Sequence, residues 1–250
     1  MKALITGASS GIGKDMAKYL SKKGYELILV ARRSELLEKL SRELNTNTEI
    51  IICDLSKEKE VYKLYEKVKN KNIDLLINNA GFGLFGMFNK TDLDKELEMI
   101  DVNIKSLHIL TKLFLIDFTK RDYGNILNVA SSAGFLAGPG LSTYYATKNY
   151  VLKLTMAIYH ELKLQKSNVH ISALCPGPVN TEFNKVAKGK FTIKGLSSEY
   201  VAKYAIDKTL KNKMIIVPGI NIKLGLFFQR FIPYKLLLKI VGDFQKRKGI

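Results

Sequence analysis

The sequence predicts a doubly wound α/β fold, a parallel sheet of about seven strands with helices on both faces, and two observations lead to it. Short runs of Ile, Leu and Val without polar alternation recur along the chain, at residues 2–6, 25–31, 48–53, 73–78, 125–130, 169–174 and 214–217. Continuous apolar runs are typical of strands that are buried on both faces. Helical patterns separate these runs, and strands that alternate with helices form parallel sheets joined by right-handed crossovers.

The first three intervening segments have the apolar spacing of amphipathic helices. Residues 12–23 follow a glycine-rich turn, residues 35–44 carry leucines on one stripe, and a third helix follows Ser56, which we expect to cap it. No linker or repeat interrupts the alternation before about residue 212. We therefore expect one domain, with the α/β unit in residues 1–220 and an apolar and basic extension of the same domain in residues 221–250.

The composition is that of an ordinary globular protein, since 46% of the 250 residues are hydrophobic and 25% are charged. The two cysteines, Cys53 and Cys175, have no C-x-x-C or zinc-ligand spacing. We therefore expect no disulfide framework, no metal site and a reducing, cytoplasmic compartment. The chain begins without the apolar stretch of a secretory signal and has no run of about 18 apolar residues, so the sequence predicts no membrane span.

The chain is strongly basic, with 40 Lys and Arg against 23 Asp and Glu and a formal net charge of +17. Such a field attracts anions, among them nucleotide phosphates, anionic lipid and acidic carrier proteins, although it can also serve solubility alone. Residues 208–250 contain ten Lys or Arg and one acid, Asp243, so contact with a membrane surface or an acidic carrier would use this end of the chain. The sequence has no recognised nucleic-acid-binding motif, and we expect no nucleic acid partner.

A glycine-rich turn, T-G-A-S-S-G-I-G, joins the first predicted strand to the first predicted helix. Its glycines, Gly7, Gly11 and Gly13, would let the backbone approach a pyrophosphate, and the helix N-terminus would offer free N–H groups. The spacing is G-x-x-x-G-x-G rather than the commoner G-x-G-x-x-G. The turn therefore indicates a dinucleotide-binding site.

A serine hydrolase is an alternative interpretation of the same turn, because G-A-S-S-G also fits the G-x-S-x-G nucleophile elbow. Such an enzyme would need a downstream acid and one of His108, His160 and His170. The turn lies only six residues from the start of the chain and no oxyanion loop precedes it. The three histidines lie within strand and helix patterns, which also argues against a hydrolase.

Further motifs follow in a fixed order. Asn78-Asn79-Ala80-Gly81 ends the fourth predicted strand, Ser131 follows the fifth, and Tyr144 and Lys148 lie one helical turn apart. Together with the glycine turn and P-G-P-V-N-T, these motifs resemble the short-chain dehydrogenase/reductase family over about residues 1–220. The resemblance implies a Rossmann-like fold, a homodimer or homotetramer, and hydride transfer between a nicotinamide dinucleotide and a carbonyl or secondary alcohol. A non-catalytic dinucleotide-binding protein is the alternative, against which the Tyr144–Lys148 pair argues.

The resemblance implies four catalytic residues: Asn103, Ser131, Tyr144 and Lys148. Tyr144 would be the general acid, and Lys148 would lower the pKa of the phenol, ordinarily near 10, and bind the nicotinamide ribose. Ser131 would polarise the carbonyl. Asn103, in D-V-N-I-K-S, would hold a proton-relay water.

Two of these assignments choose between adjacent residues. Ser131 lies thirteen residues before Tyr144, which matches the family motif, and Ser132 is its alternative. Tyr144 is preferred over Tyr145 because it alone has a lysine four residues later. We expect Tyr145 to be a packed helix residue.

The resemblance also implies which residues bind the dinucleotide. They are Gly7, Ser9, Ser10, Gly11, Ile12, Gly13, Arg32, Arg33, Asp54, Leu55, Asn79, Ala80, Gly81, Tyr144, Lys148, Pro176, Gly177, Val179 and Thr181. Enzymes that prefer NAD place an acid after the second strand, where this chain has Arg32 followed by Arg33. Guanidinium groups bind a 2′-phosphate and carboxylates repel it, so we expect NADP (NADPH) in preference to NAD.

The motifs define the substrate less closely. The segment G-F-G-L-F-G-M-F, residues 81–88, is apolar and lies near the expected carbonyl site. Residues 182–196, with Gly189 and Gly195, are expected to cover the substrate. The tail from Ile220 would form an apolar lid, or pack on the core or on a second subunit. We therefore expect an apolar or acyl-chain carbonyl substrate.

Overall fold

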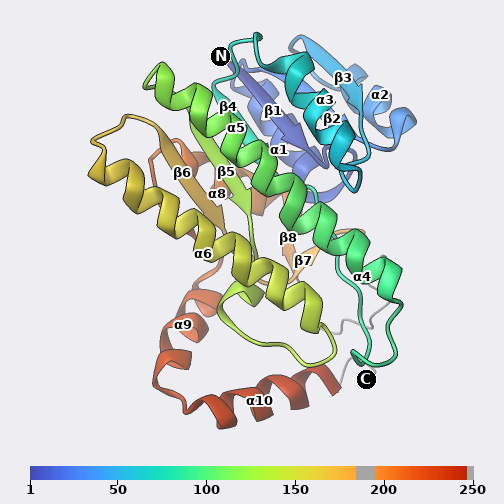
Figure 1. Cartoon of the computed structure of the whole chain (residues 1–250), viewed down its shortest axis with the longest axis vertical. Helices are drawn as coiled ribbons and strands as arrows, with labels where there is room; N and C mark the ends of the chain where they lie inside the picture. Colours follow the sequence, from blue (N-terminus) through green and yellow to red (C-terminus); the bar gives the residue numbers. More distant parts are fainter. Residues whose placement is uncertain (184–194, 247–250) are drawn as a thin grey trace.

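The computed structural model describes residues 1–183 and 195–246, and its centre is a seven-stranded parallel sheet (Figure 1). The strands are β1 Lys2–Thr6, β2 Glu26–Ala31, β3 Thr48–Ile52, β4 Leu75–Asn78, β5 Asn125–Val129, β6 His170–Leu174 and β9 Ile215–Ile216. They lie in the order β3-β2-β1-β4-β5-β6-β9. Every neighbouring pair is parallel, which confirms the doubly wound fold and all seven predicted strands.

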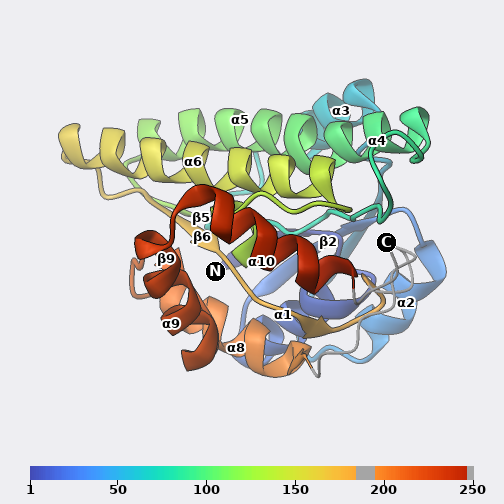
Figure 2. The same ribbon diagram turned by 90° about the horizontal axis from the view of Figure 1, so that it is seen from below.

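Helices cover both faces of this sheet (Figure 2). One layer contains α1 Gly11–Lys22, α2 Ser34–Arg42 and α8 Ser198–Thr209, and the other contains α3 Glu58–Val68, α5 Leu107–Lys120 and α6 Ser142–Leu164. Successive strand residues alternate between the two cores, so that Ile5 packs in the first layer and Leu4 in the second, and both are fully buried. This alternation explains why the strands are apolar at nearly every position.

The direction in which the chain adds strands to the sheet reverses between β3 and β4, so that β1 and β4 lie side by side. From β1, the strands β2 and β3 extend to one side, and β4, β5, β6 and β9 extend to the other. The helices that follow β1 and β4 therefore cover opposite faces of the sheet. Ligand clefts of α/β sheets form at such a place.

Ser56 does not cap α3, contrary to the prediction. The helix begins at Glu58 and is preceded by Lys57, which makes no capping hydrogen bond through its side chain. The backbone N–H and the hydroxyl of Ser56 instead donate to Asp54 Oδ1, at 3.1 and 2.8 Å. The serine thus stabilises the turn after β3 and leaves the helix uncapped.

A second, two-stranded sheet was not predicted from the sequence. It pairs β7 Val179–Asn180 with β8 Leu196–Ser197 in parallel. Two residues are too few to show a strand pattern. Between them lies most of the segment expected to cover the substrate, and its residues 184–194, with Gly189, lie outside the described residues.

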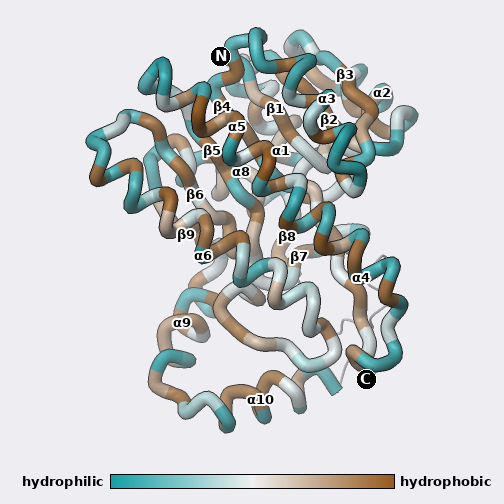
Figure 3. The backbone as a smooth tube through the Cα atoms, in the orientation of Figure 1, coloured by the Kyte–Doolittle hydropathy of each residue, from teal (hydrophilic) through white to brown (hydrophobic). Residues whose placement is uncertain are grey.

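The C-terminal segment contains α9 Ile220–Phe228, the short turn η3 Gln229–Phe231 and α10 Tyr234–Lys246. The two helices form the lower edge of the molecule in Figure 1, and the hydropathy colouring shows short apolar segments interrupted by hydrophilic ones in both (Figure 3). α10 passes beside the loop before α6, where Gly242 lies against Pro139. In the part of the chain that is described, no helix combines the length and apolarity that a membrane crossing requires.

Candidate active site

A cleft of about 690 Å³ opens at the carboxyl edge of the sheet. Its walls come from the loops after β1, β2, β3, β4, β5 and β6 and from the first turns of α6. Every site residue predicted from the sequence lines this cleft except Gly13 and Asn103. The fold therefore brings together residues that lie far apart in the sequence.

The glycine-rich turn lies against the end of β4. Gly7 and Gly11 have φ angles of +65° and +54°, a region of backbone space that favours glycine. A Cβ on Gly7 would lie 2.8 Å from the Cα of Ala80, and the Asn79 side-chain amide donates to the Gly7 carbonyl at 3.1 Å. Gly13 packs beneath the turn, where a Cβ would overlap that amide, so it shapes the turn without lining the cleft.

The first turn of α1 faces the cleft and suits a phosphate group. Its N-cap residue, Ser10, makes no capping hydrogen bond through its side chain among the described residues. Ser10, Gly11 and Ile12 line the cleft, so the free N–H groups of this turn and the positive end of the helix dipole lie at the cleft. The close glycine backbone and this helix end fit the pyrophosphate of a dinucleotide.

Ser131, Tyr144 and Lys148 meet in the middle of the cleft. Tyr144 and Lys148 lie on one turn of α6, with the Lys148 Nζ 5.8 Å from the centroid of the Tyr144 ring. Lys148 is buried and donates to the Val129 carbonyl at 2.8 Å. Ser131 follows β5, and its hydroxyl hydrogen-bonds the Tyr144 side chain. The structure thus places Ser131 beside Tyr144, and Ser132 lines the same cleft.

Burial governs the protonation of this pair. It raises the pKa of Tyr144 to about 12, against a smaller lowering by the hydrogen bond with Ser131. Burial also lowers the pKa of Lys148 to about 8. Burial is the largest influence on the pKa of Tyr144, and the influence that acts against it comes from Ser131. Lowering of this pKa by Lys148 stays a prediction.

Asn103 lies behind the cleft wall in a π-helical turn, η1 Asp101–Ser106, which joins α4 Leu93–Ile100 to α5. Turns of this kind often occur at functional sites. The Asn103 Nδ2 donates to the Phe82 carbonyl at 2.9 Å and to the Thr147 hydroxyl at 3.1 Å, and its Oδ1 accepts from the Phe82 N–H at 3.0 Å. The fully buried Asn103 thereby ties the loop after β4 to α6.

Arg33, after β2, turns toward the glycine-rich turn. Its guanidinium donates to Ser10 Oγ at 2.8 Å and to Ser9 Oγ at 3.2 Å. It also pairs with Glu182 at 3.1 Å. Arg33 therefore supplies a positive charge directly beside the first turn of α1.

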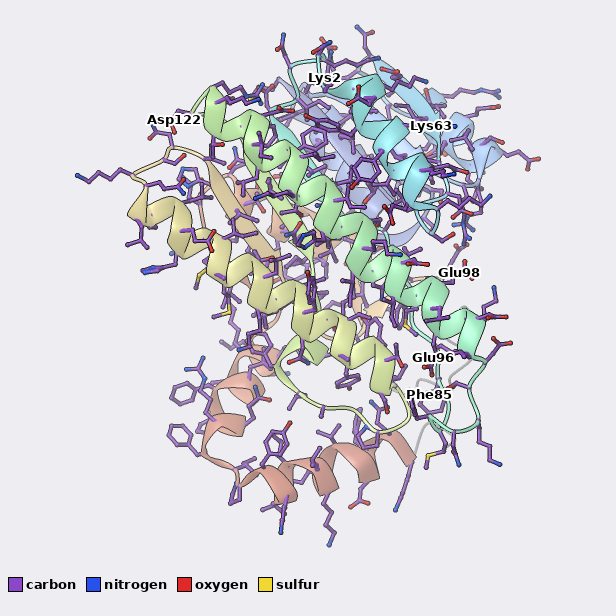
Figure 4. All side chains as sticks on the ribbon, viewed as in Figure 1. Lys2, Lys63, Phe85, Glu96, Glu98 and Asp122 are labelled. Carbon is purple, nitrogen blue, oxygen red and sulfur yellow. The ribbon has the colours of Figure 1, made fainter. Side chains whose placement is uncertain are left out.

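Arg32 turns away from that position. Its guanidinium pairs with Glu98 at 3.0 Å and lies 3.9 Å from Asp54. Glu98 comes from α4 (Figure 4) and lines the same cleft. The sequence pointed to Arg32 as the first basic contact of the cofactor, whereas the structure places Arg33 beside the glycine turn and holds Arg32 between two carboxylates.

The other end of the cleft is apolar. Its walls include Phe82, Leu84, Leu141, Tyr145 and Phe183. The Phe183 ring lies 5.2 Å from that of Tyr144 and covers Gly83, where a Cβ would lie 2.8 Å from Phe183 Cζ. Tyr145 packs edge-on against Tyr144 at 6.2 Å and accepts a hydrogen bond from Gln245 at 2.9 Å. Tyr145 is thus a packed helix residue that also lines the cleft.

Sequence reasoning missed Glu98, Phe183 and Gln245. Phe183 lies inside the segment expected to cover the substrate, so its position was a usable signal. Glu98 and Gln245 have no such signal, because their partners lie 66 and 100 positions away in the chain.

The serine hydrolase alternative lacks a base at the turn. None of His108, His160 and His170 is among the described residues that line the cleft. His108 instead contacts the Tyr150 hydroxyl at 2.8 Å. Ser9 accepts from Arg33, which cannot act as a general base at neutral pH.

Comparison with known proteins agrees with this geometry. The family model described as short chain dehydrogenase matches residues 1–190. An uncharacterized oxidoreductase of Staphylococcus saprophyticus is 38% identical over 182 residues, which cover 72% of this chain and 74% of that protein. The very-long-chain 3-oxoacyl-CoA reductase of Anas platyrhynchos is 31% identical over 198 residues, which cover 76% of this chain and 63% of that protein. The solved structure of a short-chain dehydrogenase from Sphingobium yanoikuyae in complex with NADPH aligns with a TM-score of 0.83 at 27% identity and covers 92% of each chain.

The chain therefore belongs to the short chain dehydrogenase family. Its fold, its glycine-rich turn and its paired tyrosine and lysine are those of an NAD(P)-dependent oxidoreductase.

Proposed function

We propose that this protein uses NADPH to reduce the carbonyl group of an apolar or acyl-chain substrate to a secondary alcohol, and that it can catalyse the reverse oxidation. One observation carries the proposal. Ser131, Tyr144 and Lys148 meet in a cleft that is also lined by the glycine-rich turn and by apolar side chains.

Arg33 supports NADPH as the cofactor. The 2′-phosphate would lie between the Arg33 guanidinium and the hydroxyls of Ser9 and Ser10, which already form one hydrogen-bonded group. The Sphingobium yanoikuyae relative, which binds NADPH, supports the same choice. Asp54 would bind the adenine, with Leu55 beside it.

The remaining cofactor contacts follow from the residues that line the cleft. Asn79, Ala80 and Gly81 would lie along the adenine ribose, and the backbone of Pro176, Gly177 and Val179 would meet the nicotinamide. Thr181 would bind its carboxamide or a phosphate. Lys148 would bind the nicotinamide ribose.

In the reaction the bound nicotinamide would supply the hydride, and this chain would hold the carbonyl and supply the proton. Ser131 would donate a hydrogen bond to the carbonyl oxygen as negative charge develops on it. Tyr144 would then give its proton to that oxygen, which completes the alcohol. A pKa of about 12 keeps Tyr144 protonated at neutral pH, as a proton donor requires. Lys148, charged below about pH 8, would stabilise the tyrosinate that remains.

Asn103 would act on the reaction indirectly, without contact with the substrate. Both polar atoms of its side chain are already hydrogen-bonded, to Phe82 and Thr147. We infer that it positions the loop after β4 against α6. A relay water would be limited to the second lone pair of its Oδ1.

The apolar end of the cleft supports an apolar or acyl-chain substrate. The C-terminal extension flanks this end twice, since Ile222 packs on Gly177 and Gln245 hydrogen-bonds Tyr145. These contacts support treating the described part of the extension, residues 221–246, as part of the same domain. The similarity to a very-long-chain 3-oxoacyl-CoA reductase points to the same substrate class.

We further propose a homodimer or homotetramer in the cytoplasm. Both cysteines are free and buried, which a reducing compartment preserves. A substrate carried on an acidic protein would be attracted by the net charge of +17.

A panel of carbonyl compounds tests the function. NADPH oxidation would be followed by absorbance with ketones and 3-oxoacyl thioesters of increasing chain length. Turnover that improves with chain length supports the proposal. Tight NADPH binding without turnover of any carbonyl would instead identify a non-catalytic dinucleotide-binding protein.

A further inference from the structure

α9 is an apolar helix that lies at the surface. None of the residues of this helix, all of which the structure describes, is buried. Ile220, Leu224, Phe227 and Phe231 recur at a helical spacing, and they are 65%, 48%, 52% and 73% exposed. The Phe227 ring packs edge-on against Phe228 and Phe231, at 5.4 and 5.6 Å between centroids. A helix with apolar residues on all sides is normally buried against other protein or lipid. We therefore expect this cluster to bind a partner surface.

α10 continues the pattern on its outer face. Leu238, Val241 and Gln245 face the protein, while Leu236, Ile240 and Phe244 are exposed at intervals of four residues. Lys235 and Lys239 precede the first two of these and form a basic stripe beside the apolar one. The side of the helix that faces away from the core therefore carries an apolar stripe beside a basic one.

The charges around these apolar stripes have one sign. Residues 220–246 contain five basic residues, Lys223, Arg230, Lys235, Lys239 and Lys246, and a single acid, Asp243. Asp243 lies 3.8 Å from Lys246, so its charge is already paired. The surface thus joins exposed aromatic and aliphatic side chains to a positive rim.

We propose that α9, η3 and α10 form an interfacial surface that binds anionic phospholipid bilayers. The phenylalanine and leucine side chains enter the boundary between headgroups and acyl chains, and the lysines contact lipid phosphates. A second copy of this chain fits less well, because a two-fold contact on this surface would bring the same cations face to face. The proposal stands apart from the proposed catalytic function, since it uses no residue of the reaction site.

Binding to vesicles of defined composition tests the proposal on the full chain. Co-sedimentation compares vesicles of phosphatidylcholine with vesicles that contain equal parts of phosphatidylcholine and phosphatidylglycerol. We expect binding to the anionic vesicles at least about tenfold stronger, with a marked loss between about 50 mM and about 500 mM salt. Equal binding to both compositions, or none to the anionic vesicles, overturns the proposal without the use of any variant.

Matched variants distinguish vesicle binding by this surface from a general attraction of the basic chain to anionic lipid. Phe231→Ser should weaken binding to anionic vesicles about fivefold or more, whereas Leu164→Ser, at a residue that is 71% exposed on α6, should leave it unchanged. Lys235→Gln with Lys239→Gln should weaken binding. Lys59→Gln with Lys63→Gln, which has the same spacing on α3 at the opposite end of the molecule (Figure 4), should not. Equal losses in test and control variants overturn the proposal.

Two further outcomes identify other occupants. Sedimentation velocity without lipid measures whether Phe231→Ser reduces the mass of the particle. A loss of mass with unchanged vesicle binding would assign the surface to a second copy of the chain. Binding that depends on Lys235 and Lys239 but not on Phe231 would indicate an acidic protein partner. Either result contradicts the bilayer proposal.

Discussion

The side-chain amide of Gln245 donates to the Tyr145 hydroxyl at 2.9 Å, which joins the last helix to a residue one hundred positions earlier. Tyr145 lines the cleft and packs edge-on against Tyr144. Gln245 is fully buried, and its Oε1 has no hydrogen-bond partner within the described residues. This polar contact therefore attaches the C-terminal helix to the wall of the reaction site.

Loss of this contact should change substrate preference. Gln245→Ala and Tyr145→Phe each remove the hydrogen bond, so each should lower kcat/KM for long acyl substrates more than for short ones. Because both variants break one interaction, their effects in the double variant should be less than additive. Steady-state kinetics on the four proteins measures this coupling. Additive losses that are equal for short and long substrates would show that α10 only stabilises the fold.

Tyr144→Phe should abolish turnover and preserve cofactor binding. The variant removes the proton donor and few other contacts, so kcat should fall about 10²- to 10⁴-fold. Dinucleotide binding can be measured by fluorescence titration. Tyr145→Phe is the matched control and should keep most of its activity toward short substrates. An active Tyr144→Phe together with an inactive Tyr145→Phe would assign catalysis to the other tyrosine.

Arg33→Ala should weaken NADPH binding more than Arg32→Ala. The Arg33 side chain lies beside Ser9 and Ser10, and the loss of a hydrogen bond between charged groups corresponds to about 10- to 100-fold in affinity. Arg32 is held by Glu98 and Asp54, so its removal should matter less. Binding of NADH, which lacks the 2′-phosphate, serves as the control. Equal losses for NADPH and NADH would contradict a phosphate-binding role for Arg33.

Lys148 should make the stability of the protein depend on pH. Its pKa is about 8 in the folded protein and 10.5 ordinarily, so between these values the unfolded chain binds more protons than the folded one. The contribution of this group to stability is therefore unfavourable below about pH 8 and is relieved as the pH rises toward 10.5. Lys148→Met removes this dependence. The Tm of the variant, relative to wild type, should thus be higher at about pH 7 than at about pH 10. A difference that does not change with pH would contradict the depressed pKa.

Much of the fold could be predicted because the signals are local. Buried parallel strands such as β1 and β2 are apolar at successive positions, and the Tyr144–Lys148 pair is recognisable from helical spacing alone. Ser56 shows the limit of local reasoning. It stands where a cap is expected, but the neighbouring Asp54 accepts its two donors and the helix begins without it.

The details of the site depend on residues that are distant in the chain. Arg32 and Arg33 are adjacent, and no local feature shows that Glu98 holds one while the serines of the glycine turn accept from the other. The pKa values of Tyr144 and Lys148 likewise depend on burial by the assembled sheet and helices. Spacing in the sequence shows that the two can meet, but it does not show whether desolvation or charge attraction is stronger.

The rate of NADPH oxidation in the presence of a long-chain 3-oxoacyl thioester tests the central claim most directly. The account predicts turnover by the wild-type protein, lower but measurable turnover by Tyr145→Phe, and loss of at least about 100-fold in Tyr144→Phe with NADPH still bound. Equal rates in wild type and Tyr144→Phe, or no oxidation of bound NADPH with any carbonyl of the panel, would contradict it.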